Sequence, residues 1–186
     1  MQIDTSINPL EKNPDEEEMI RLVGFRVNPD VEGVEFYSIF LEANVDRPLI
    51  IDERFAFFTE INAAKNIIKN SNLCEKTDLF EAKGEIDYCC DIAETLYLIA
   101  SQRVDQQAVI LNCINTILDL EKWLKIKAPE EFKQGLRLFA DYLTFHQELE
   151  SFFESEKITR REITNAIIWY VGAIFICSTI ITSLEA

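Results

Sequence analysis

Three carboxylates occur at helical spacing near the middle of the chain. Asp87, Asp91 and Glu94 are separated by four and then three positions, so on a helix they would lie along one side. Carboxylate oxygens are the ligands that Mg²⁺ prefers in proteins. A bound magnesium ion can activate water or stabilise a transferring phosphoryl group. These residues are therefore the candidate binding site of the sequence.

A magnesium centre of this kind needs ligands from a second helix, which is how all-α nucleotide hydrolases hold their metal. Asp119 and Glu121 fall near the end of a predicted helix. Glu148, Glu150 and Glu154 alternate with apolar residues of another helix and lack the matching spacing. The alternative is a solvated acidic face. We therefore predict no metal site and no cofactor.

The single histidine is the one candidate for imidazole acid–base chemistry. Glu150 follows His146 by one turn on the same predicted helix, so its carboxylate could orient the imidazole of a general base. The alternative is a packed histidine, because aromatic and aliphatic residues surround it in the pattern. No nucleotide-binding, metalloprotease, serine-hydrolase or calcium-loop motif is present. We predict no catalytic residue, and His146 with Glu150 remain the candidate acid–base pair.

The first part of the chain is predicted to form strands. Apolar residues, many of them β-branched or aromatic, gather in four segments that turn residues separate. The segments are 19–27, 34–41, 49–51 and 55–58. Thr59 is the candidate N-cap of a helix that runs to Asn70. This order predicts an antiparallel meander of three or four strands followed by one helix.

After residue 84 the apolar spacing is helical almost to the end of the chain. Three amphipathic helices are predicted over 89–100, 104–125 and 129–153. Thr159 and Glu162 then form a capping box before the last helix. The sequence therefore predicts an α+β fold, predominantly helical, in which a bundle of about five helices follows the meander.

The C-terminal stretch 163–184 contains no charged residue. Its length meets the criterion for a membrane-spanning helix, which is about 20 residues. Polar residues such as Asn165 and Ser178, and the inward positions of Trp169 and Tyr170, favour a helix packed among other helices. We predict a central, buried C-terminal helix, and a tail anchor is the alternative.

Composition bounds the domain organisation and the compartment. Residues 1–18 are polar and acidic without the apolar core of a secretory signal, and they are predicted to be a polar leader. A single domain is predicted over 19–186, with a sub-boundary at 71–84 where the periodicity is lost. The five cysteines have no CxxC spacing, which is typical of thiols in a reducing compartment. The predicted location is the cytoplasm.

The net charge of −15 limits the partners that the protein can bind. It repels phosphate backbones, so nucleic-acid binding is not expected. The same charge keeps a chain with an apolar interior in solution, and it also suits a basic protein partner. Membrane contact through 163–184 is disfavoured, and a homodimer is left open.

Three classes of function remain. The first, which we favour, is a small acidic protein-binding or regulatory module of the inhibitor or immunity type. The second is a metal-dependent all-α nucleotide hydrolase that uses Asp87, Asp91 and Glu94. The third is a tail-anchored membrane adaptor. Coordinates separate the first two, because a catalytic site requires side chains that converge, whereas an acidic face disperses them.

Overall fold

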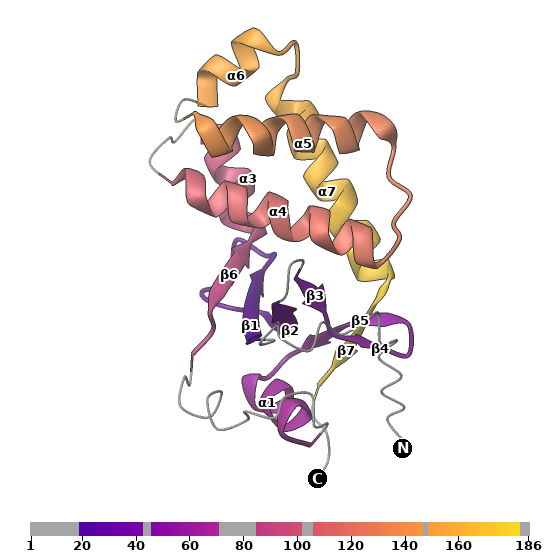
Figure 1. Cartoon of the computed structure of the whole chain (residues 1–186). Helices are drawn as coiled ribbons and strands as arrows, with labels where there is room; N and C mark the ends of the chain where they lie inside the picture. The colour runs from indigo at the N-terminus through magenta and orange to yellow at the C-terminus, as the bar shows by residue number, and fades with distance from the viewer. Residues whose placement is uncertain (1–18, 43–45, 71–84, 102–105, 147–148, 183–186) are drawn as a thin grey trace. The chain divides into compact units, whose positions relative to one another are not determined.

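The computed structural model describes residues 19–42, 46–70, 85–101, 106–146 and 149–182, and it shows an α+β fold (Figure 1). The predicted leader and the predicted sub-boundary at 71–84 lie outside these residues. The chain divides into two compact units. The sheet unit comprises Met1–Phe25, Gly33–Cys89 and Cys177–Ala186, and the helical unit comprises Arg26–Glu32 and Cys90–Ile176.

Seven strands form one mixed sheet in the described part of the chain. Their order is β4-β5-β2-β1-β6, with β3 beside β2 and β7 beside β5. The strands are β1 (Met19–Arg26), β2 (Phe36–Glu42), β3 (Arg47–Pro48), β4 (Ile50–Ile51), β5 (Arg54–Phe58), β6 (Tyr88–Asp91) and β7 (Ser178–Ile181). The pairs β1–β2 and β4–β5 are antiparallel, whereas β5–β7 is parallel. The strands β6 and β7 come from later in the chain than the sequence prediction placed any strand.

Strand β5 is buried on both of its faces. Ala56 and Phe58 belong to a core that includes residues of α1 (Ile61–Asn70), among them Ala64. Phe55 and Phe57 alternate with these residues and point to the other face, where the Phe57 and Phe25 rings lie 5.1 Å apart in an edge-to-face arrangement. A strand buried on both sides has a continuous apolar sequence rather than an alternating one. Phe-Ala-Phe-Phe is such a run.

Gly24 in β1 allows a close approach within the sheet unit. A Cβ at this position would lie 2.7 Å from Cγ2 of Val34 and 3.0 Å from Cδ1 of Ile86. Side-chain atoms do not pack that closely, so any larger residue would displace one of these neighbours.

The uncharged C-terminal stretch changes from helix to strand. Helix α7 spans Arg160–Ile176, and β7 begins at Ser178, so the prediction of a single helix over 163–184 is wrong in its last part. The β-branched run Thr-Ile-Ile favours extended backbone, and β5 supplies the hydrogen-bond partners. The N–H of Phe55, for example, donates to the carbonyl of Cys177 at 3.0 Å. Among the described residues, no helix combines the length and apolar character needed to cross a membrane.

The helical unit consists of α3 (Ile92–Ser101), α4 (Gln107–Trp123), α5 (Glu130–Phe145), α6 (Leu149–Ser155) and α7. Helix α7 packs against α3, α4 and α5, and α6 packs against α5 (Figure 1). Side chains from several of these helices are fully buried, among them Ile114, Leu136, Phe139 and Ile167. The predicted helix over 129–153 is wrong in its continuity, because it is divided into α5 and α6.

The first turn of α7 has the predicted capping box. The N–H and the hydroxyl of Thr159 both donate to Oε2 of Glu162 at 2.7 Å, and the N–H of Glu162 donates back to Oγ1 of Thr159 at 3.2 Å. These hydrogen bonds from Thr159 lower the pKa of the Glu162 carboxyl. The pair satisfies N–H groups that the helix itself leaves without a partner.

Burial along α7 follows one face only. Ile163, Ala166, Ile167, Tyr170 and Ile174 are buried, at the three- and four-residue spacing of a helix side. Ile168 is 54% exposed and Ile180 in β7 is 49% exposed, so the predicted burial of the stretch 163–184 is wrong at these two positions. The absence of charged residues from Ile163 onward suggested complete burial, but it is equally compatible with an apolar face turned outward.

Candidate functional site

The three predicted carboxylates lie where the chain changes from β6 to α3. The helix begins at Ile92, so Asp87 precedes β6, Asp91 ends it, and only Glu94 is helical. The prediction that all three share one side of a helix is therefore wrong. An extended segment carries residues four positions apart away from each other, whereas a helix brings them onto one face.

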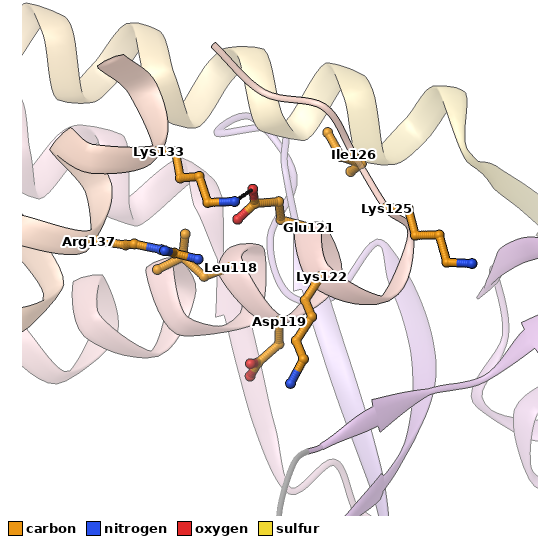
Figure 2. A pocket seen from close by; sticks show the side chains of 8 residues that line it. All are labelled: Leu118, Asp119, Glu121, Lys122, Lys125, Ile126, Lys133 and Arg137. Carbon is orange, nitrogen blue, oxygen red and sulfur yellow. Dashed lines mark ion pairs between the residues drawn. The ribbon is translucent and has the colours of Figure 1, made fainter. Parts of the chain in front are cut away.

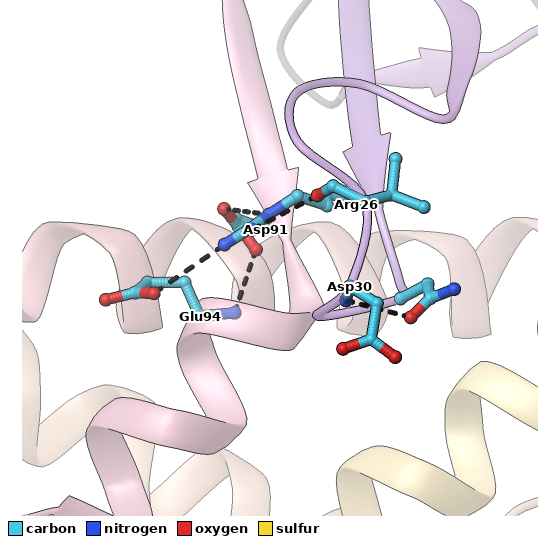
Figure 3. A network of polar contacts seen from close by, with 6 residues as sticks. Arg26, Asp30, Asp91 and Glu94 are labelled. Atoms are coloured by element: carbon cyan, nitrogen blue, oxygen red, sulfur yellow. Dashed lines mark hydrogen bonds and ion pairs between the residues drawn. The ribbon is translucent and has the colours of Figure 1, made fainter.

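Asp91 and Glu94 form a network with Arg26 in the helical unit (Figure 3). Oδ1 of Asp91 accepts the N–H of Glu94 at 2.8 Å, which makes Asp91 the N-cap of α3. Its Oδ2 accepts Nε of Arg26 at 2.9 Å, and Nη2 of Arg26 lies 3.6 Å from Oε2 of Glu94. Both carboxylates are therefore engaged by the chain's own donors.

Asp87 belongs to the sheet unit and bonds to the backbone of β1. Its Oδ2 accepts the N–H of Leu22 at 2.9 Å, and its own N–H donates to the carbonyl of Leu22 at 2.8 Å. These two hydrogen bonds hold the segment before β6 against β1.

In the described part of the chain, no group of three His, Cys, Asp or Glu side chains is arranged to hold a metal ion.

His146 lies at the C-terminal end of α5, where it is exposed. Its N–H donates to the carbonyl of Tyr142 at 2.9 Å, and its ring stacks on the Tyr142 ring with centroids 4.5 Å apart. Its carbonyl accepts Nε2 of Gln107 at 2.9 Å. The ring is therefore held by an aromatic neighbour on its own helix.

Glu150 does not share a helix with His146. Helix α5 ends at Phe145 and Glu150 lies in the first turn of α6, so the predicted spacing of one helical turn is wrong. The Oε1 atom of Glu150 lies 3.8 Å from Nη2 of Arg160, and its side chain is 57% exposed. This contact stabilises little because water screens it.

A cavity of about 400 Å³ lies between the end of α4 and the first half of α5, entirely within the helical unit (Figure 2). Four of the residues that line it are basic and two are acidic. The lining residues are Leu118, Asp119, Glu121, Lys122, Lys125, Ile126, Lys133 and Arg137. The cavity is therefore cationic on balance, in a chain whose net charge is −15.

Glu121 is the buried charge of this cavity. Its side chain is only 4% exposed, and Oε1 lies 2.7 Å from Nζ of Lys133 (Figure 2). The hydroxyl of Tyr170, from α7, is buried close to Glu121 without a well-formed hydrogen bond to any described residue. Burial raises the pKa of Tyr170 well above its usual range, the charge of Glu121 acts in the same direction, and Arg137 opposes it.

The sequence analysis missed the N-cap role of Asp91 and the basic lining of the cavity, although the sequence contains signals for both. Asp91 and Glu94 have the D-x-x-E spacing of a helix start, the same pattern that identified Thr159 and Glu162. The basic lining was visible as five of the chain's 18 Lys and Arg residues within 122–137. No sequence signal pairs Glu121 with Lys133, because that contact depends on how α4 packs against α5.

The surface of the helical unit also exposes large apolar side chains. On α7 they follow a single stripe with Ile168 54% and Ile176 75% exposed, and Gly172 lies between them. The described side chains thus offer an apolar stripe and a cationic cavity as surfaces for binding.

Comparison of the chain with protein-family models, curated proteins and solved structures gives no match.

Proposed function

We propose that this protein is a non-catalytic protein-binding module of the regulatory type, and that it binds a basic protein through the outward face of α7. The observation that carries the proposal is the stripe of Asn165, Ile168, Gly172 and Ile176, which is exposed and contains no charged residue beyond the first turn of α7. In this proposal the helices α3–α7 act as one bundle that holds the stripe rigid.

An exposed apolar stripe on a highly charged chain needs an explanation. Charged residues make up 27% of the sequence, yet none occurs from Ile163 to Ile176. Single exposed apolar residues are ordinary, but Ile168 and Ile176 are exposed on one side of the same helix with no charged residue between them. Ile168 and Ile176 are eight positions apart, about two turns, so both lie on the outward side of the helix.

The net charge supports a basic partner. At −15 the chain attracts a basic protein from a distance and repels other acidic ones. Charge of this kind raises the association rate, while the apolar centre of the interface supplies most of the affinity. The metal-dependent hydrolase is not proposed, because Asp91 and Glu94 are bound to Arg26 and Asp87 is bound to Leu22.

Site-specific crosslinking tests this function. A photoreactive amino acid placed at Ile168 or Ile176 of the full chain should capture one basic protein in the native cell. The matched control is Leu138 on α5, which is 47% exposed but lies on another helix. The purified partner should then bind the Ile168→Asp variant about tenfold or more weakly than wild type, as for a central apolar contact.

Three outcomes would overturn the proposal. The first is equal capture from Leu138 and from the two α7 positions. The second is capture of a second copy of this chain or of lipid instead of a basic protein. The third is unchanged affinity in the Ile168→Asp variant when circular dichroism shows that it is folded.

A further inference from the structure

The cationic cavity between α4 and α5 has more positive charge than its own carboxylates balance. Lys133 is paired with Glu121 at 2.7 Å. Lys122, Lys125 and Arg137 line the same cavity and form no ion pair with a residue in the described part of the chain. Clustered unpaired cations repel one another, and a bound anion would relieve that repulsion.

The ion pair with Glu121 fixes the position of one cation in the lining, the Lys133 ammonium. The carboxylate of Glu121 is buried, so it holds the Lys133 ammonium at a fixed place in the lining. The Lys133 side chain is 31% exposed, so a ligand can approach it from the solvent. Pre-positioned cations bind with a smaller entropy cost than mobile ones.

The basic lining is unusual for this chain. With 33 acidic and 18 basic residues, chance would surround most surface hollows with carboxylates. Here four basic side chains from α4, α5 and the segment between them line the cavity together with two acidic ones. A volume of about 400 Å³ suits a small molecule.

We propose that this cavity binds a small phosphate-bearing molecule that carries at least two negative charges. Lys122 and Lys133 would act as point charges on the phosphate oxygens, and Arg137 would supply a planar pair of donors. The ligand site lies on α4 and α5, so it does not depend on the protein-binding surface proposed for α7.

Titration of the full chain with inorganic pyrophosphate tests the proposal at near-physiological ionic strength. We expect saturable binding of one pyrophosphate per chain by calorimetry. The Lys122→Gln/Arg137→Gln double variant should bind about tenfold or more weakly, because each substitution removes a charge-assisted hydrogen bond. Both residues are exposed, so the variant should keep its fold.

The matched control is Lys127→Gln, an exposed lysine close in sequence that does not line the cavity. It should change the affinity by less than about twofold, since it alters only the long-range field. Amide chemical shifts of the wild type should move in the α4–α5 region on adding pyrophosphate. The proposal is overturned by no saturable binding up to about 10 mM, by equal weakening in the control, or by shifts confined to other helices.

Discussion

Two contacts between a carboxylate and a cation in the helical unit differ in their access to water. Asp91 and Arg26 have side chains that are 21% and 20% exposed, and Asp91 also accepts the N–H of Glu94. Glu121 is 4% exposed, whereas Lys133 is 31% exposed. Both pairs are short, but Glu121 has given up far more of its hydration.

This difference in burial predicts which of the two ion pairs matters more for the free energy of unfolding. Asp91 has two kinds of donor, a guanidinium and a backbone N–H, so losing one leaves the other in place. Glu121 is paired with Lys133 alone among the cations of the described residues. A buried charge without its partner is more costly than the contact is favourable.

Removal of Lys133 should have the largest effect. The Lys133→Met variant should lose about 2 to 3 kcal/mol of unfolding free energy, somewhat less than for a fully buried pair because Lys133 is partly exposed. Urea denaturation measures this loss. The Glu121→Gln/Lys133→Met double variant should recover much of it, since a neutral amide is easier to bury. A single variant as stable as wild type would show that Glu121 reaches water.

Replacement of Asp91 should have a smaller effect. Asp91→Ala removes the N-cap of α3 and the partner of Arg26, and we expect a loss of about 1.5 to 2 kcal/mol. Asp91→Asn keeps an oxygen that can cap the helix, so it should lose less than half as much. Thermal melts of the two variants measure the difference. Equal losses would mean that the ion pair, rather than the cap, is what stabilises this region.

The Tyr170→Phe variant tests the surroundings of Glu121. It should change the free energy of unfolding at neutral pH by less than about 0.5 kcal/mol, because it removes a buried hydroxyl without a well-formed partner. At alkaline pH the outcome differs. The pKa of Tyr170 is raised above 10.0 in the folded state. The neutral phenol therefore makes its full contribution to the free energy of unfolding below pH 10, and that contribution is lost as the pH rises further. The variant should lose less stability above pH 10 than wild type, as denaturation at several pH values would show. Identical pH profiles would contradict the prediction.

Glu162→Gln should have the smallest effect, because its capping box is exposed. The pKa of Glu162 is lowered from 4.5 by the hydrogen bonds from Thr159. The ionised Glu162 carboxylate therefore contributes to the free energy of unfolding above pH 4.5, and this contribution is lost as the pH falls below that value. Thermal melts at pH 7 and pH 3 should show a weaker acid dependence in Glu162→Gln than in wild type. Glu156→Gln, an exposed glutamate outside α7, should keep the wild-type dependence. An unchanged profile for Glu162→Gln would argue against the capping role.

Much of the local structure could be predicted from the sequence. Strands near 19–27 and 55–58, the helix ending at Asn70 and the start of α7 at the Thr159 capping box all appear in the structure. Each is decided by residues within a few positions of one another, through side-chain periodicity or a capping hydrogen bond. The α+β class follows from these local patterns.

The amino-acid sequence by itself determined the charge of the chain, the positions of most helices and the absence of charge in α7 after its first turn. Only the tertiary structure decided that Ser178 begins a strand, because β5 supplies its partner from more than a hundred residues away. In the same way Asp91 became an N-cap paired with Arg26, which lies 65 positions earlier. Such contacts form when distant elements pack together, and no pattern within one segment encodes which neighbour it will meet.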